Sequence, residues 1–493
     1  MARAYYYQGR VYADLDQPEK AIQSFTEALR NDPLLPLAYY YRGRAYADMG
    51  YPEQAIREYD MAVQIEPGLT LAYYYRGSAY AVMGQFEQAI QSYADALRLD
   101  PQLPLAYYYQ GRYYSFMGES EQAIQAFNEA LEKNPQLPMG YYYRGRYYAE
   151  TGQPEQAILN FTEALELDPE LPLAYYYRGR AYDAIGQPEQ AAREYGEAIK
   201  LDPRLTLAYY YRARYYSDTG QIEQAIEDYS EALELDPELT LAYYYRGRAY
   251  DALGQREQAV REYDQAIERN TQLSIALYYR GRAYADLDQP EQTIQSFTDA
   301  LELDPELTLA YFYRGRAYDA MGQPEQAVRE YDEALELDPE LTMAYYYRAR
   351  YYSETGQFEQ AIQEYNEALR LDPELSLACY YRGRAYDATG QPEQAIMQYE
   401  EALKLDPQIT LAYYYRARYY SDKGQIEQAI EDYSEALELD PGLTLAYYYR
   451  GRAYADSGQP EQAVSDYTES LELDPELVLA YYYRGLAYKE LLE

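Results

Sequence analysis

The sequence contains no histidine, no tryptophan and a single cysteine, Cys379. Without histidine, the chain lacks the side chain that most often serves as a general base or a metal ligand. A single thiol forms no internal disulfide, so Cys379 is expected to be a packing residue. No Gly-rich phosphate loop, nucleophile motif or Cys/His metal cluster is present either. These absences favour a non-enzymatic protein that uses no cofactor and no metal ion.

The sequence is also poor in positive charge and in long apolar runs. Asp and Glu outnumber Lys and Arg by 83 to 43, which gives a formal net charge of -40. This charge argues against general binding to nucleic acid or to anionic membranes. No apolar run approaches the ~18–20 residues of a membrane-spanning helix, and the first residues show no secretory signal. The compartment is therefore unknown: cytoplasmic by default, or extracellular if the chain is assembled as a fibre.

Tyrosine, in contrast, is abundant, with 73 copies, and many belong to one recurring segment. The segment Tyr-Tyr-Tyr-Arg-Gly-Arg-Ala-Tyr stands at 39–46 and at 243–250, and it returns with small changes every 34 residues without insertion or deletion. An uninterrupted period indicates one array of stacked repeats instead of separate globular domains. Fourteen tandem repeats cover 2–477 and a lone helix covers 478–493. Together they predict one continuous solenoid.

Each repeat is predicted to form two helices. In the repeat 308–341, the first helix is expected from about 309 to 321, ending at Gly322, because glycine takes the left-handed conformation that ends a helix. The second helix is expected to start near Pro324 and to end before Pro339, since proline disfavours helix in the residue before it. Tyr311 and Gly315 belong to one apolar stripe of the first helix. One helix pair alone does not bury its stripes, so neighbouring repeats must stack.

This spacing resembles that of a known family. The signature W-x2-L-G-x2-Y…A-x3-F…P of the tetratricopeptide repeat is matched in 308–341 by Tyr311, Arg314, Gly315, Tyr318, Ala327, Tyr331 and Pro339. The chain is therefore similar to a bacterial-type tandem array of this family, with Tyr-rich repeats. The resemblance implies an all-α, right-handed superhelical solenoid of antiparallel helix pairs. It also implies that the first helices line a concave face and that the array acts as an interaction scaffold.

Several residues depart from the family pattern. Arg314 stands where the family has Leu, and a buried Arg is costly unless its head is paired. We expect its stem to lie between the helices and its guanidinium to reach the Asp before the Pro that follows a second helix. Asp16 and Asp288 replace the turn glycine, and Thr271 replaces the Pro between repeats. Slightly looser joints are expected at those places.

The first helices carry the candidate binding surface. If the first Tyr of a triplet is a core residue, the second and third point about 100° and 200° around the helix from it. A row of Tyr then runs beside a row of the second Arg of each repeat, within a strongly acidic coat. We expect these side chains to line one continuous concave groove. The predicted site residues are Tyr176, Tyr177, Arg180, Tyr210, Tyr211, Arg214, Tyr244, Tyr245, Arg248, Tyr278, Tyr279 and Arg282.

Three functions stay open on this evidence. The leading hypothesis is a non-enzymatic scaffold that binds an extended protein or peptide partner of acidic and aromatic character in the groove. A second is a structural protein that assembles end to end into a filament, as a head-to-tail homo-oligomer, because Tyr481, Gly485 and Tyr488 still present a packing stripe at 478–493. A third is a carbohydrate-binding or envelope-associated array, in which a glycan stacks on the Tyr rings.

A structural interpretation of the same residues is equally open. The second and third Tyr of each triplet could pack against the same residues of adjacent repeats. Each second Arg could pair with an acidic residue one turn on, as Arg44 with Asp48, in a surface pair that contributes only ~0.3–0.5 kcal/mol.

Overall fold

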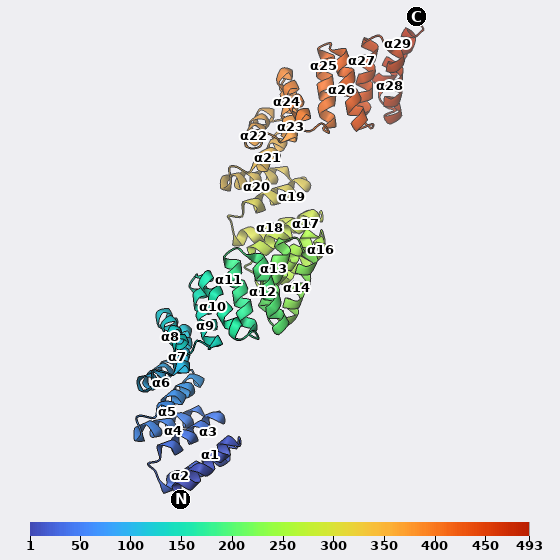
Figure 1. Ribbon diagram of the computed structural model, residues 1–493. Coiled ribbons are helices and arrows are strands. Elements are labelled where there is room, and N and C mark those ends of the chain that lie inside the picture. The colour runs from blue at the N-terminus through green and yellow to red at the C-terminus, as the bar shows by residue number, and fades with distance from the viewer. Residues whose placement is uncertain (493) are drawn as a thin grey trace. The chain divides into compact units, whose positions relative to one another are not determined.

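The computed structural model describes residues 1–492, which form 29 α-helices joined by short turns, with no strand among them (Figure 1). The predicted all-α fold of helix pairs is confirmed. The internal contacts divide the chain into two units, Met1–Ala249 and Tyr250–Glu493. In both units a first helix of 13 residues alternates with a second helix of 14 residues. None of the described helices is long and apolar enough to cross a membrane.

The first unit contains α1 to α14 and most of α15, within which the division falls. Its first helices are α1 (Ala2–Asp14), α3 (Pro36–Asp48), α5 (Thr70–Val82), α7 (Pro104–Phe116), α9 (Pro138–Glu150), α11 (Pro172–Ala184), α13 (Thr206–Asp218) and α15 (Thr240–Ala252). Its second helices are α2 (Pro18–Asn31), α4 (Pro52–Ile65), α6 (Phe86–Leu99), α8 (Ser120–Lys133), α10 (Pro154–Leu167), α12 (Pro188–Leu201) and α14 (Ile222–Leu235).

The second unit follows the same alternation from α16 to α29. Its first helices are α17 (Ser274–Asp286), α19 (Thr308–Ala320), α21 (Thr342–Glu354), α23 (Ser376–Ala388), α25 (Thr410–Asp422), α27 (Thr444–Asp456) and α29 (Val478–Glu490). Its second helices are α16 (Arg256–Arg269), α18 (Pro290–Leu303), α20 (Pro324–Leu337), α22 (Phe358–Leu371), α24 (Pro392–Leu405), α26 (Ile426–Leu439) and α28 (Pro460–Leu473).

The helix ends follow the turn chemistry of the sequence. Gly322, after α19, has φ of 68°, and Asp16 and Asp288 take the same left-handed region with φ of 55°. Pro324 is the first residue of α20. Beyond that helix, the Oδ1 atom of Asp338 accepts the backbone N–H of Glu340 at 2.9 Å. The boundaries predicted for 308–341 are confirmed to within one residue.

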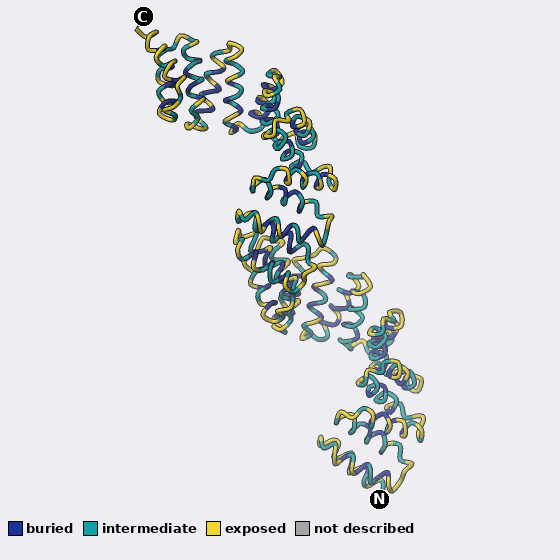
Figure 2. The backbone as a smooth tube through the Cα atoms, turned by 180° about the vertical axis from the view of Figure 1, so that it is seen from behind, coloured by how far each residue is buried: buried dark blue, intermediate teal, exposed yellow. Residues whose placement is uncertain are grey.

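Small residues let the two helices of a repeat approach closely. A Cβ atom added to Gly315 would lie 2.6 Å from Cε1 of Tyr331, so the ring of Tyr331 fills the space that a side chain would need. Ala327 and Ala334 of α20 are fully buried beside it. In each unit, buried residues lie along the facing sides of the helices, and the turns are mostly exposed (Figure 2).

The buried member of most Tyr triplets is the second, so the interpretation that the first Tyr is the core residue was wrong; Tyr74 is half-buried and Tyr482, in α29, is exposed. Tyr176 exposes only 5% of its surface, whereas Tyr175 and Tyr177 are half-buried. The reason is that α11 packs against both α10 and α12. The buried part of its surface therefore faces two helices, and the second Tyr lies on that part.

The first Arg of each repeat lies between helices, as predicted, but its partner differs from the prediction. Arg314 donates from Nε to Oε2 of Glu330 at 2.9 Å, and from Nη1 to the Thr298 hydroxyl at 3.1 Å. Its side chain is 15% exposed. The carboxylate therefore comes from the middle of the second helix of the same repeat. The Asp before Pro is not the partner, because Asp338 binds the backbone of its own turn.

The central tyrosine of the second helix has a different environment in different repeats. Tyr331 donates its hydroxyl to Oδ2 of Asp319 at 2.5 Å, and Tyr399 donates to Asp387 at 2.6 Å. Tyr59, in the first unit, is equally buried, but its hydroxyl has no hydrogen-bond partner among the described residues. Ala47 stands there at the position that Asp319 holds in its own repeat. Equally buried tyrosines thus differ in whether their hydroxyl makes a hydrogen bond.

Candidate interaction surface of the first helices

In most repeats the second Arg lies over the third Tyr of the next repeat. The guanidinium carbon of Arg180 is 4.0 Å from the ring centre of Tyr211, and its Nη1 atom donates to the hydroxyl of Tyr176 at 3.4 Å. Arg44 lies over Tyr75 in the same way, at 4.6 Å. An exposed cation–π contact contributes about 0.5–1 kcal/mol. The row of Arg is therefore held on the row of Tyr.

The same contact recurs within both units. In the first unit the further pairs are Arg10 with Tyr41 at 4.1 Å, Arg112 with Tyr143 at 5.0 Å, Arg146 with Tyr177 at 5.0 Å and Arg214 with Tyr245 at 5.3 Å. In the second unit they are Arg282 with Tyr313 at 5.3 Å, Arg316 with Tyr347 at 4.1 Å, Arg350 with Tyr381 at 5.7 Å, Arg384 with Tyr415 at 3.9 Å, Arg418 with Tyr449 at 5.4 Å and Arg452 with Tyr483 at 4.7 Å.

The second Arg pairs with an acid one turn on in some repeats. Arg146 binds Glu150 at 3.0 Å, and Arg350 binds Glu354 at 3.2 Å. Arg44, for which a pair with Asp48 was considered, lies instead over the aromatic ring of the next repeat. The Tyr rings therefore pack as the structural interpretation expected, and that the same surface binds a partner stays a prediction.

The structure separates the predicted site residues by burial. The second tyrosines are core residues with exposures of 5–7%, so their rings are not available to a partner; they are Tyr176, Tyr210, Tyr244 and Tyr278. The third tyrosines are half-buried, and they are Tyr177, Tyr211, Tyr245 and Tyr279. The arginines are exposed, and they are Arg180, Arg214, Arg248 and Arg282.

Contacts connect the predicted residues within each unit. In the first unit, Tyr176 contacts both Tyr177 and Tyr211, with ring centres 4.9 and 6.2 Å apart. Arg248 donates to the hydroxyl of Tyr244 at 3.2 Å. In the second unit, the ring of Tyr278 is 5.1 Å from that of Tyr279. That both sets share one continuous concave groove stays a prediction.

Burial changes the acidity of the groups around this surface. It raises the pKa of Tyr210 to about 12, against the opposing effect of Arg214. It also raises the pKa of Asp183, although the hydroxyl of Tyr195 donates to that carboxyl and works in the other direction. Elsewhere, burial raises the pKa of the Cys379 thiol, which fits a packing role. Within residues 1–492, no group of three or more carboxylate or thiol side chains is arranged to hold a metal ion.

Pockets open between neighbouring first helices. One pocket, of about 460 Å³, lies between α11 and α13 and is lined by Arg180, Asp183, Ala184, Gly186, Pro188, Tyr211, Arg214, Tyr215 and Asp218. A pocket of about 340 Å³ lies between α19 and α21, lined by Arg316, Asp319, Ala320, Gly322, Pro324, Tyr347, Arg350, Tyr351 and Glu354. A third, of about 430 Å³, lies between α23 and α25, lined by Arg384, Asp387, Ala388, Pro392, Tyr415, Arg418, Tyr419 and Asp422.

These three pockets occur where two kinds of repeat meet. The first repeat of each pair contains Arg-Gly-Arg-Ala-Tyr-Asp, and the next contains Arg-Ala-Arg-Tyr-Tyr-Ser. The second kind places Tyr215, Tyr351 or Tyr419 where other repeats have a buried Ala such as Ala181. Sequence reasoning missed these tyrosines and the acidic residues beside them. The signal that marks these tyrosines is the change from Arg-Gly-Arg to Arg-Ala-Arg in the repeats that contain them.

Family comparisons agree with the repeat pattern. Models described as tetratricopeptide repeat match 6–70, 70–103, 104–137, 126–158, 172–205, 244–307, 312–376, 376–409 and 398–431. A model described as TPR repeat matches 145–186, 213–254, 417–458 and 451–491. None of the curated proteins compared with the chain matches it.

Three solved structures illustrate what the chain is similar to. YrrB, described as a TPR protein with an unusual peptide-binding site, is 26% identical over 39% of this chain and 99% of its own, with a TM-score of 0.36. The C-terminal part of a TPR repeat-containing protein from Cytophaga hutchinsonii is 22% identical over 50% and 99%, with a TM-score of 0.43. MamA from Desulfovibrio magneticus is 23% identical over 34% and 95%, with a TM-score of 0.33.

The family matches recur along the chain from residue 6 to residue 491. They fall on the same helix pairs whose close approach depends on the small residues and central tyrosines of the signature. The chain therefore belongs to the tetratricopeptide repeat family.

Proposed function

We propose that the protein is a scaffold that binds an extended protein or peptide partner along its first helices. The observation that supports this proposal is the recurrence of one pocket type, with two arginines and a half-buried tyrosine, at the three junctions described above. A surface that repeats along the chain suits a partner that is itself extended. The partner would bring acidic side chains to the arginines and aromatic ones to the tyrosines.

The exposed arginines suit carboxylates in particular. A guanidinium group presents a planar set of donors that can bind a carboxylate through two parallel hydrogen bonds. One face of Arg180 lies against the ring of Tyr211, which holds the group in place. A side chain that is already ordered loses less conformational entropy when a partner binds.

The test replaces the arginines of one pocket. The variant Arg180→Gln/Arg214→Gln and the wild type are titrated with a fluorescein-labelled peptide of alternating Glu and Tyr, and binding is followed by fluorescence anisotropy. Arg30→Gln/Arg98→Gln is the matched control, because both arginines lie on second helices and their side chains are 70% and 72% exposed. We expect at least about tenfold weaker binding for the pocket variant, which corresponds to about 1.4 kcal/mol.

Equal affinity in the pocket variant and the control would contradict the proposal. A collapse of thermal stability in the pocket variant alone would show that these arginines are structural. No contact among the described residues favours the glycan hypothesis or end-to-end assembly, so each of these stays a hypothesis from the sequence.

A further inference from the structure

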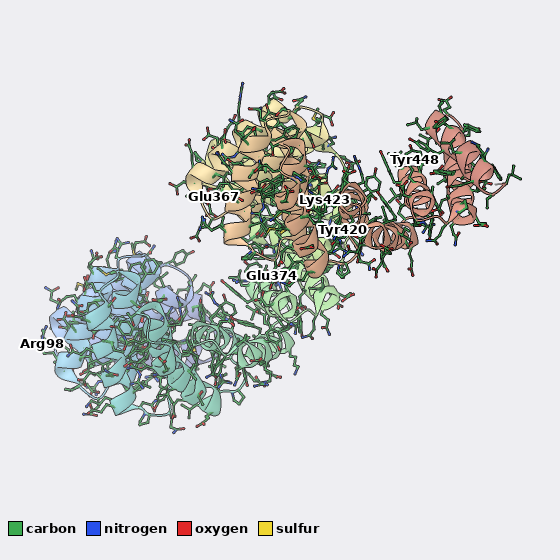
Figure 3. The ribbon with its side chains drawn as sticks, turned by 90° about the horizontal axis from the view of Figure 1, so that it is seen from above. Arg98, Glu367, Glu374, Tyr420, Lys423 and Tyr448 are labelled. Carbon is green, nitrogen blue, oxygen red and sulfur yellow. The ribbon has the colours of Figure 1, made fainter. Side chains whose placement is uncertain are left out.

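One lysine of the chain contacts a residue that lines the third pocket. Lys423 follows α25, and its Nζ atom binds Oε1 of Glu393, at the start of α24, at 3.0 Å. The same Nζ atom lies 5.4 Å from the ring centre of Tyr419, which lines the pocket. Figure 3 labels Lys423 beside Tyr420, another aromatic residue of α25. An ammonium group is thus held between a carboxylate of one repeat and an aromatic ring of the next.

The other two pockets have the same receiving groups without this lysine. At the first pocket, Tyr215 and Glu189 stand at the places of Tyr419 and Glu393, and Thr219 stands at the place of Lys423. The second pocket repeats this arrangement with Tyr351, Glu325 and Thr355. Glu189 and Glu325 are exposed, as Glu393 is. Neither pocket therefore receives an ammonium group from that position of its own repeat.

We propose that a lysine side chain of a partner protein binds beside the pocket at Tyr215 and beside the pocket at Tyr351, with its ammonium group placed as that of Lys423 is placed between Glu393 and Tyr419. The carboxylates of Glu189 and Glu325 would accept its hydrogen bonds, and the tyrosine ring would face it as a cation–π partner. A second acidic residue, Asp218 or Glu354, lines each of these pockets.

The positive groups of the pockets do not prevent this binding. Arg384 and Arg418 line the third pocket together with Tyr419, and Lys423 nevertheless lies over the Tyr419 ring. Each arginine lies against a tyrosine of the following repeat. The guanidinium carbon of Arg384 is 3.9 Å from the ring centre of Tyr415, and that of Arg418 is 5.4 Å from the ring centre of Tyr449. The net charge of -40 also favours a basic partner segment over long distances.

The inference goes beyond the proposed function and involves other groups at the same junctions between repeats. Carboxylates of a partner would bind Arg180 and Arg214, whereas its lysine would bind Tyr215 and Glu189. A partner segment that carries both charges would use both sets of groups. The two proposals can fail separately, because the acidic peptide tests the arginines and a lysine peptide tests the tyrosine and the glutamate.

The experiment occupies the two proposed lysine sites with a lysine from the chain itself, in what we call the filled variant. In Thr219→Lys/Thr355→Lys, each new lysine stands where Lys423 stands naturally, with a similar backbone: φ is -95° at Thr219, -87° at Thr355 and -89° at Lys423. The control Gln23→Lys/Gln292→Lys adds the same charge at exposed positions of α2 and α18. The probe is fluorescein-labelled octalysine, at about 0.15 M salt, where charges beyond about 8 Å are largely screened.

We expect the filled variant to bind octalysine about fivefold more weakly than the control, from the loss of a cation–π contact and a surface ion pair. The reverse change, Lys423→Thr, frees Glu393 and the Tyr419 ring for an external lysine. It should strengthen binding relative to Lys404→Thr, which removes the same charge from α24. The variants should not differ in their affinity for octalysine acetylated on every Nζ, since acetylation removes the ammonium charge.

Equal binding by the filled variant and its charge-matched control would overturn the inference, as would equal binding by Lys423→Thr and Lys404→Thr. Circular dichroism of every variant separates a lost pocket from a lost fold. If the filled variant unfolds, the comparison of Lys423→Thr with Lys404→Thr decides the matter alone.

Discussion

Removal of the Tyr331 hydroxyl tests whether the polar atoms of the core determine local stability. Tyr331 is fully buried, and its hydroxyl donates to Oδ2 of Asp319 at 2.5 Å. A hydrogen bond to a charged group contributes about 1.5–3 kcal/mol. Because Asp319 is only half-buried, water can replace part of the lost bond. We therefore expect Tyr331→Phe to lower the local free energy of unfolding by about 1.5 kcal/mol, at the lower end of that range.

The same substitution at Tyr59 is the matched control. Tyr59 is also fully buried, but its hydroxyl has no partner among the described residues. A buried hydroxyl without a partner loses its hydration on folding and regains nothing. Tyr59→Phe is therefore expected to leave stability unchanged or to raise it by about 1 kcal/mol.

The effect at Tyr331 should depend on pH. Burial raises the pKa of Asp319 above its usual value, while the bond from Tyr331 and the charge of Arg350 lower it. The hydroxyl thus stabilises the ionised carboxylate, and its removal raises the pKa of Asp319 further. The loss of stability in Tyr331→Phe should be complete at neutral pH. It should diminish as the pH falls through the folded-state pKa of Asp319, because the protonated acid needs the donor less.

Hydrogen exchange measured by mass spectrometry suits this test better than a global melting curve, because repeat arrays open locally and are not always two-state. Peptides of α20 in Tyr331→Phe should exchange about tenfold faster than in the wild type, which corresponds to about 1.4 kcal/mol. Peptides of α4 in Tyr59→Phe should exchange at the wild-type rate or more slowly. Equal acceleration in the two variants would refute the reasoning, because it would show that loss of the hydroxyl matters irrespective of its partner.

Two further predictions concern the turns and the close approach of the helices. Asp288 has φ of 55°, so Asp288→Gly should relieve strain and raise stability by about 0.5–1 kcal/mol net of the added chain entropy; slower hydrogen exchange in α17 and α18 would confirm it, and faster exchange would contradict it. Gly315→Ala should destabilise by about 1–2 kcal/mol, because its Cβ atom would lie 2.6 Å from a Tyr331 ring that Asp319 holds in place. Gly196→Ala is the control: only Nη1 of Arg212, at 3.7 Å, comes near its added Cβ atom, so better helix propensity should stabilise it by about 1 kcal/mol. Urea unfolding of both variants measures the contrast, and a shift of the same sign in both would contradict it.

The sequence by itself determined what depends on neighbouring residues. The period, the two helices of each repeat and their ends all follow from glycine, proline and apolar spacing over a few residues. The left-handed turns at Gly322 and Asp288 are of this kind. So is the close approach at Gly315, since the family signature places a small residue opposite a ring.

The tertiary structure alone decided which side chains of one helix meet those of another. Whether Tyr175 or Tyr176 is buried depends on the two second helices that enclose α11. The partner of Arg314 is Glu330, 16 residues away, and the tyrosine under Arg180 belongs to the next repeat. Such pairs depend on the angle at which two helices cross and on their relative shift along their axes. Helical periodicity gives the direction of a side chain around its own axis but leaves these two quantities undetermined.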